Sequence, residues 1–371
     1  TFPKPPAVTQ AITNAMKKYG ANPGRSGHKM SIESALEIYR CRNEISDFFN
    51  AEGPEYVVFT LNCTYAANMV LKGLLKPGNH VVISCLEHNA VTRPLRALEE
   101  KGITFTQAKV FPGDNDATLN SFREAINDRT ALIVCTCASN VWGIRLPISR
   151  ITALAHQYGV PVMVDAAQGA GVIPIDMQES QIDYLCLSGH KGLYGPMGVG
   201  VLIATHKENL LTIIEGGTGT NSVSYIQPNS MPDKFESGTP NMPGIAGLRA
   251  GIKFLKNTGV ENIAKHEHNL INHLYDKLSK LDFIELYAPK PSPENFVPLL
   301  SFNVKNHDSE IISAYLDENG IAVRPGLHCA PSAHKFYNTL DRGAVRICPS
   351  YFTKQSEIDS LILALKKFNL K

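Results

Sequence analysis

Between Tyr56 and Ala204, short apolar segments alternate with longer stretches of helical periodicity. The apolar segments read YVVFT, HVVISC, ALIVCTC, VPVMVD, YLCLS and GVGVLIAT. Strands separated by helices are typical of an α/β domain with a mostly parallel sheet. Because these segments are apolar almost throughout, we expect both faces of the sheet to be covered.

The pattern changes after Gly238. A long helical region from 244 to 281 is followed by the short strand segments LLSFNV and IAVRP and by a final helix, SEIDSLILALKKF. This order predicts a smaller C-terminal α/β domain. We expect a large domain over 14–250 and a small domain that comprises 251–371 together with the N-terminal segment 1–13. We expect no disordered linker between the two domains.

Composition narrows the choice of partners. The chain has 371 residues, 43% of them hydrophobic, which is enough for a large core. Its net charge is only +2, so bulk electrostatics favours neither nucleic acid nor a membrane surface as a partner. No apolar run reaches the about 18 residues of a membrane span, and no signal pattern opens the chain.

Cysteine usage bears on the compartment. The eight cysteines are scattered without a C-x-x-C motif, and several lie in apolar segments. This usage is typical of a reducing compartment, so we expect a cytoplasmic protein. The chain opens on Thr1 rather than methionine, and we expect a few residues to precede it.

Polar groups follow the expected strands at the ends where ligands of α/β sheets bind. In chain order these residues are Cys63, Thr64, His88, Asn140, Asp165, Gln168, Ser188, His190 and Lys191. Each has an ordinary explanation alone, since Thr64 could simply cap a helix and Lys191 could be a solvated loop lysine. Together they supply a lysine, a carboxylate, an imidazole, an amide and anion donors, which is what pyridoxal phosphate requires.

The motifs VMVDAAQGAG, LSGHKGLYGPMGVG, EHNAV, SNVWG, FESGTPNMPG and VRPGLHCAP resemble those of class V aminotransferase-like, fold-type I pyridoxal-phosphate enzymes. Within that family the chain is most similar to the cysteine desulfurases and selenocysteine lyases of the SUF type (group II). The resemblance covers essentially the whole chain in the same order. It implies a mostly parallel sheet of the seven-stranded type and a homodimer with shared active sites.

The resemblance also implies roles for the residues. Lys191 would form the Schiff base, Asp165 would pair with the pyridine nitrogen, and His88 would stack on the ring and act as a catalytic residue with Lys191 and Cys329. Gln168 and Asn140 would neighbour the oxygens of cofactor and substrate. The remaining cofactor contacts would be Cys63, Thr64, Ser188 and His190, together with Thr239 from the second subunit.

Two departures from the family pattern concern the phosphate site of the cofactor and the substrate pocket. Relatives have a hydroxyl residue followed by Thr-Glu at the positions of Cys63, Thr64 and Tyr65. Backbone N–H groups would therefore bind part of the phosphate. The family's N-x-H-R loop reads Asn-Pro-Gly-Arg and ends at Arg25, which we expect at the substrate pocket without the usual histidine.

Cys329 lies in a loop rich in proline and glycine that we expect to be exposed and partly mobile. Arg324 and His328 beside it would favour the thiolate. An inert loop cysteine is the plain alternative, and a zinc site with His334 lacks a fourth ligand. Arg346 matches the family's receptor for the substrate carboxylate, with Arg324 beside it, although an interdomain ion pair would also explain an arginine there.

These residues predict an enzyme that converts L-cysteine, or L-selenocysteine, to L-alanine and leaves the sulfur as a persulfide on Cys329. A sulfur-acceptor protein would then be a further partner. An aminotransferase, lyase or epimerase of the same family is the first alternative. A cofactor-bound scaffold for sulfur assembly is the second.

Overall fold

The computed structural model describes residues 2–23, 27–205 and 210–368. The helices are α1 Pro6–Lys18, α2 Lys29–Phe48, η1 Pro54–Tyr56, α3 Cys63–Leu74, α4 Asn89–Glu99, α5 Asn115–Ala125, α6 Ile148–Gln157, α7 Met242–Thr258, α8 Val260–Leu278, α9 Ser309–Glu318, α10 Pro331–Phe336 and α11 Gln355–Phe368. The strands are β1 Val57–Thr60, β2 His80–Ser84, β3 Thr104–Ala108, β4 Thr130–Thr136, β5 Val162–Asp165, β6 Tyr184–Ser188, β7 Gly200–Ala204, β8 Ile284–Leu286, β9 Leu300–Val304 and β10 Val345–Ile347. Within the described ranges, no helix combines the length and apolarity needed to span a membrane.

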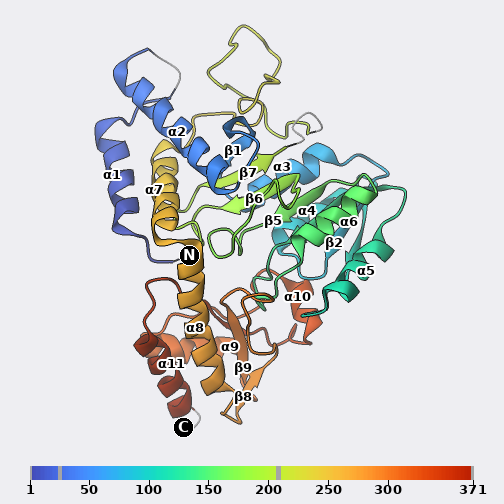
Figure 1. Ribbon diagram of the computed structural model, residues 1–371, viewed down its shortest axis with the longest axis vertical. Coiled ribbons are helices and arrows are strands. Elements are labelled where there is room, and N and C mark those ends of the chain that lie inside the picture. The colour runs from blue at the N-terminus through green and yellow to red at the C-terminus, as the bar shows by residue number, and fades with distance from the viewer. Residues whose placement is uncertain (1, 24–26, 206–209, 369–371) are drawn as a thin grey trace.

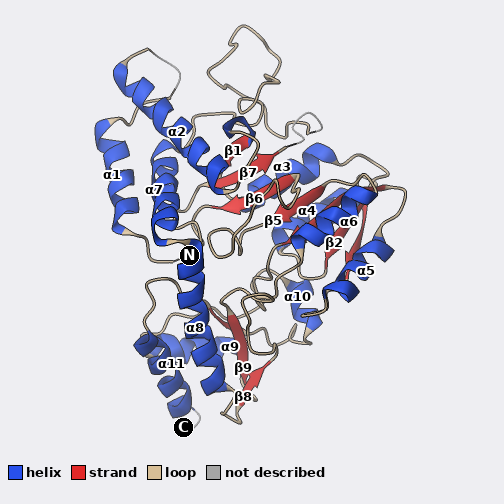
Figure 2. Cartoon of the chain, viewed as in Figure 1, coloured by secondary structure: helices blue, strands red, loops and turns tan. Residues whose placement is uncertain are grey.

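A seven-stranded sheet forms the centre of the large domain, in the order β1-β7-β6-β5-β4-β2-β3 (Figure 2). All neighbours pair in parallel except β7, which runs antiparallel to both β6 and β1. The mostly parallel sheet expected from the sequence is thus confirmed. Strands β1, β2, β4, β5 and β6 all end at the same edge of the sheet.

Two hydrophobic cores cover the two faces of this sheet. Along β4 the side chains alternate between them, since Ile133 and Cys135 lie in one core and Leu132 and Val134 in the other. Helices α2, α5, α6 and α7 pack on the first face, and α3 and α4 on the second. This burial on both sides explains why the strands are apolar at nearly every position.

The C-terminal part forms a three-stranded antiparallel sheet, β10-β9-β8, with a core of its own against α8, α9 and α11. The long helical region expected after Gly238 is broken at Gly259 into α7 and α8. Gly251, where the sequence suggests the domain boundary, lies inside α7. The N-terminal helix α1 packs along α7 (Figure 1).

Two expectations about strands are corrected by the structure. The segment IAVRP forms no strand, and only Arg324 makes an isolated bridge, to Arg346. Strand β3 has no counterpart among the expected strands. It reads TFTQA and lies at the edge of the sheet with most of its residues exposed or half-buried, so it lacks the apolar run of its neighbours.

Candidate active site

The carboxyl ends of five strands converge on one cavity, as expected for an open α/β sheet. Of the residues proposed from the sequence, this cavity is lined by Cys63, Thr64, His88, Asn140, Asp165, Gln168, Ser188, His190, Lys191, Arg324 and Cys329. These residues come from positions 63 to 329, so the tertiary structure brings together what the sequence separates.

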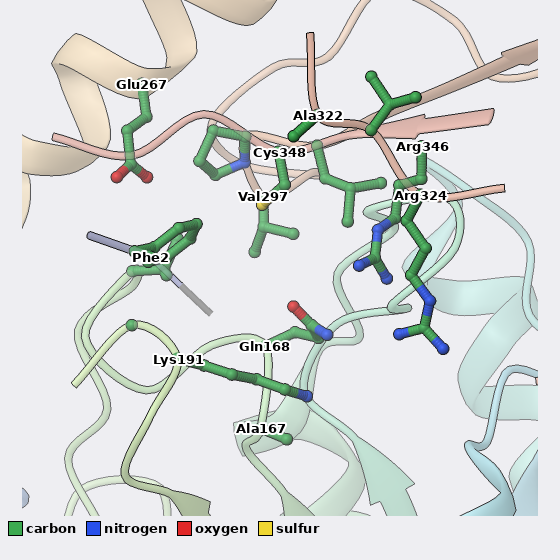
Figure 3. Close-up of a pocket in the computed structure, with 15 residues that line it drawn as sticks. Phe2, Ala167, Gln168, Lys191, Glu267, Val297, Ala322, Arg324, Arg346 and Cys348 are labelled. Atoms are coloured by element: carbon green, nitrogen blue, oxygen red, sulfur yellow. The ribbon is translucent and has the colours of Figure 1, made fainter. Parts of the chain in front are cut away.

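A second hollow adjoins the first and shares Gln168, Lys191 and Arg324 with it (Figure 3). Figure 3 shows the guanidinium groups of Arg324 and Arg346 pointing from the small domain towards Gln168 and the Lys191 amine. The site therefore lies between the two domains, with cations from both.

Asp165 ends β5 and is almost fully buried. Its Oδ1 accepts the backbone N–H of Ala167 at 2.9 Å and the thiol of Cys63 at 3.3 Å. No donor to Oδ2 is found among the described residues. One oxygen of a buried carboxylate thus remains for a cationic partner in the cavity, as a buried charge requires.

Helix α3 begins at Cys63, directly after β1, and its first turn lines the cavity. The first N–H groups of any helix lack an intrahelical acceptor and carry the positive end of the helix dipole. The Asn62 side chain caps the N–H of Tyr65 at 2.9 Å. Together with the nearby hydroxyls of Thr64 and Ser188, the remaining N–H groups can bind a phosphate.

His88 caps α4, and its Nδ1 accepts the backbone N–H of Ala90 at 2.9 Å. The neutral ring therefore carries its proton on Nε2. Burial lowers the pKa of His88, and the cations Lys191 and Arg324 add to this shift while Asp165 opposes it. A neutral imidazole suits stacking on an aromatic ring.

Asn140 connects the two domains through its amide and its backbone. Its Nδ2 donates to the carbonyl of His328 at 2.7 Å, and its own carbonyl accepts Nη1 of Arg346 at 2.8 Å. Its Oδ1 is buried without a partner in the described part of the chain. An orphaned buried acceptor that lines the cavity indicates that a ligand donor belongs there.

Lys191 is held in a turn that is packed too tightly for larger residues. Gly192 approaches the backbone of Ala170 so closely that an added Cβ would clash with its carbonyl oxygen. From the other side, Gly251 of α7 meets the carbonyl of Leu193 equally closely. The glycines of this turn thus fix the lysine between α7 and the loop after β5.

Arg346 on β10 and Arg324 opposite it present two cations to one pocket. Neither guanidinium has a carboxylate within ion-pair distance among the described residues. Nε of Arg346 is buried without an acceptor, and burial lowers the pKa of this residue. An anionic ligand would satisfy both groups.

The loop of Cys329 is docked onto the large domain by its backbone. The carbonyl of Cys329 accepts the N–H of Asn89 at 2.7 Å, and the thiol is exposed, 3.8 Å from Nη2 of Arg324. The expectation that His328 favours the thiolate is wrong. Burial, together with Arg346, lowers the pKa of His328 to about 3, and its ring bonds the carbonyl of Ala344, so it is neutral.

One proposed residue lies elsewhere. Thr239 is exposed and lines a separate hollow with Leu61 and Tyr65. Arg25 falls outside the described residues.

Several residues of the site were not expected from the sequence, namely Asn62, Thr136, Glu267 and Cys348. Thr136 ends β4 as Asp165 ends β5, so the strand-end rule could have found it. No sequence signal distinguishes Glu267 and Cys348, because they enter the site only through the packing of the small domain.

Comparisons with known proteins identify the family of the chain. The model of the aminotransferase class-V family matches residues 1–361. The chain belongs to this family. Dependence on pyridoxal phosphate is a property of the family, and the resemblance noted in the motifs is confirmed at this level.

The relatives that this chain matches over most of their length include proteins named as cysteine desulfurases. A probable cysteine desulfurase of Methanothermobacter thermautotrophicus is 33% identical, over 97% of this chain and 91% of the relative. The apo cysteine desulfurase of Thermococcus onnurineus NA1 superposes with a TM-score of 0.92 at 28% identity, over 99% of this chain and 92% of that one. The crystal structure of an Escherichia coli cysteine desulfurase gives a TM-score of 0.88 at 27% identity, over 99% and 92%. The predicted fold is thereby confirmed.

Proposed function

We propose that the chain is a pyridoxal-phosphate-dependent cysteine desulfurase of the SUF type that converts L-cysteine, or L-selenocysteine, to L-alanine. The observation that carries the proposal is an exposed thiol, Cys329, on the rim of the cavity that contains Lys191 and Asp165. An aminotransferase needs the lysine and the carboxylate but has no use for this thiol. The full-length similarity to cysteine desulfurases supports the same activity.

The residues present fit the cofactor. Asp165 offers one free oxygen to a ring nitrogen, His88 a neutral ring for stacking, and Asn140 an orphaned amide oxygen. Gln168 lines the same cavity and would neighbour the phenolic oxygen. The first turn of α3, with Thr64, Ser188 and His190, would hold the phosphate.

When bound, pyridoxal phosphate accepts electron density from the substrate's Cα and thereby makes the Cα proton acidic. Arg346 would bind the substrate carboxylate, because a planar guanidinium without a counter-ion suits a bidentate carboxylate. Lys191 would take the proton from Cα as general base and later return a proton to the product. The tight turn around Lys191 fixes the backbone of the lysine at the cavity.

Cys329 would perform the transfer of sulfur. Its thiolate attacks the substrate sulfur, so that a new S–S bond forms while the bond from sulfur to Cβ breaks. The electron pair of the broken bond stays with the carbon skeleton, which is protonated to alanine. Nη2 of Arg324 lies 3.8 Å from Sγ, whereas His328 is neutral and adds no charge beside the thiol.

We further propose a homodimer in which Thr239 completes the phosphate site of the partner subunit. Within one chain Thr239 is exposed and is not among the residues that line the cavity. Its loop is tied to α2 by the bidentate pair of Arg42 and Glu236, in which Nη1 of Arg42 lies 2.8 Å from Oε1 of Glu236. The same region exposes large apolar side chains, including Val223, Tyr225 and Ile226. Exposed apolar groups of this kind favour contact with another chain.

The compartment and the acceptor are also proposals. All eight cysteines are unpaired, which supports a reducing compartment such as the cytoplasm. The exposed position of Cys329 would allow a sulfur-acceptor protein to reach the persulfide.

Two measurements test the proposed function. Borohydride reduction of the cofactor-loaded protein should link the cofactor covalently to the peptide that contains Lys191. The Cys329→Ser variant should retain the cofactor but release alanine from cysteine at least about a hundredfold more slowly, while Cys85→Ser, a half-buried thiol outside the cavity, should match wild type. Rapid alanine release by Cys329→Ser, or amino transfer to keto acids instead, would assign the chain to another activity of the family. Cofactor and partner binding without turnover would indicate a scaffold.

A further inference from the structure

Cys63 makes a contact that its place in the sequence does not suggest. It is the first residue of α3, yet its thiol lies 3.3 Å from Oδ1 of Asp165, at the end of β5. Both residues are buried and both line the cavity. The same Oδ1 accepts the backbone N–H of Ala167, so two different elements hold one carboxylate oxygen in place.

The thiol is the donor in this contact. Burial raises the pKa of Cys63 well above its ordinary value, and the charge of Asp165 raises it further. The sulfur therefore keeps its proton across the working range of pH, and Asp165 is its hydrogen-bond acceptor. A thiol in this state is a poor nucleophile, which separates Cys63 from Cys329.

We propose that Cys63 is a positioning residue for Asp165. Its S–H holds Oδ1 from one side while the N–H of Ala167 holds it from the other, so that Oδ2 turns towards the cavity. A carboxylate held in this way presents Oδ2 to a cationic group in the cavity. The inference rests on the proposed function, in which Asp165 pairs with the pyridine nitrogen of the cofactor.

The alternative is that Cys63 merely fills space. It belongs to the hydrophobic core beneath α3, together with Ala66 and Val70. Serine and alanine separate the two roles, because both lose the volume of sulfur but only serine keeps a donor for Oδ1.

The first measurement needs no cofactor. In the infrared spectrum of cofactor-free protein, the S–H band lost in Cys63→Ala should lie at lower frequency than the band lost in Cys135→Ala. Cys135 is equally buried in β4, but no acceptor for its thiol is found in the described part of the chain. Equal frequencies would overturn the hydrogen bond itself.

The second measurement uses the cofactor-loaded protein. Cys63→Ala should release the cofactor about fivefold faster than wild type, as expected for the loss of one hydrogen bond, and the pH at which its visible absorbance changes should shift. Cys63→Ser should restore both values. Wild-type behaviour of Cys63→Ala, or equal defects in the alanine and serine variants, would refute the positioning role. A wild-type protein that binds no pyridoxal phosphate would refute the proposed function instead and leave the infrared result standing.

Discussion

Replacing Glu87 by glutamine tests whether a buried acid behind the site is neutral in the folded protein. Glu87 follows β2, and its side chain has no solvent exposure. Its Oε1 accepts the hydroxyl of Ser84 and the N–H of Thr136, whereas Oε2 has no partner among the described residues. Burial raises the pKa of Glu87 to about 8, and the nearby charge of Asp165 adds to the shift.

The shift predicts a cost to stability that depends on pH. Between pH 4.5, the ordinary value, and about 8, the unfolded chain has lost the proton that folded Glu87 retains. The free energy of unfolding therefore falls as the pH rises, by about 1.4 kcal/mol per unit and about 5 kcal/mol over the window. Above that window both states are ionised and the cost stays constant. Glutamine has the shape of the protonated acid, keeps an oxygen for Ser84 and Thr136, and cannot ionise.

Thermal melts of cofactor-loaded wild type and Glu87→Gln, at equal protein concentration and a series of pH values, measure this cost. The two melting temperatures should agree near pH 4.5. The variant should exceed wild type by about 6 °C above pH 8, because about 1 kcal/mol corresponds to little more than 1 °C in a chain of this length. Other groups that titrate, such as Glu267, cancel in the difference.

The control is Glu124→Gln, which changes an exposed carboxylate on α5. The difference in melting temperature between Glu124→Gln and wild type should not increase as the pH rises from 4.5 to 8. A difference between wild type and Glu87→Gln that is flat from acid to alkaline pH would refute the argument. So would a variant less stable than wild type at every pH, since that would mean that the folded protein requires the charge.

Three further variants test other parts of the structure. Gly192→Ala should weaken retention of the cofactor at least about tenfold, because its Cβ would displace the lysine turn from a neighbouring carbonyl; unchanged dialysis kinetics would contradict this. Arg346→Lys should raise the KM for cysteine about tenfold with a smaller change in kcat, because lysine cannot bind a carboxylate in bidentate fashion; steady-state kinetics decide. Arg42→Gln should loosen the loop anchored by Glu236 and raise the dimer dissociation constant, measured by analytical ultracentrifugation, and an unchanged constant would show that this pair does not support the interface.

Much of the large domain could be predicted from local pattern. The buried strands are apolar on both faces, so β1, β2, β4, β5, β6 and β7 stand out in the sequence. The edge strand β3 could not be recognised, because an exposed edge needs no apolar run. In the small domain, the apolar segment around Val323 looks like a strand but packs as a loop with a single bridge at Arg324.

The clustering of the large-domain residues of the candidate site followed from topology alone. Parallel strands end at one edge of a sheet, so polar residues after different strands had to meet there. The sequence by itself therefore determined the large sheet and the group of residues at its edge, because periodicity and strand ends are local properties.

Protonation and exact contacts depended on the tertiary structure. Burial makes His328 neutral beside Cys329, although its position in the sequence suggested a cation. Packing of α3 against β5 brings the thiol of Cys63 to Asp165, and docking of the small domain adds Arg346 to the cavity edge. Desolvation and hydrogen bonding act between groups far apart in the chain, and only the folded protein sets the distances and burial that control them.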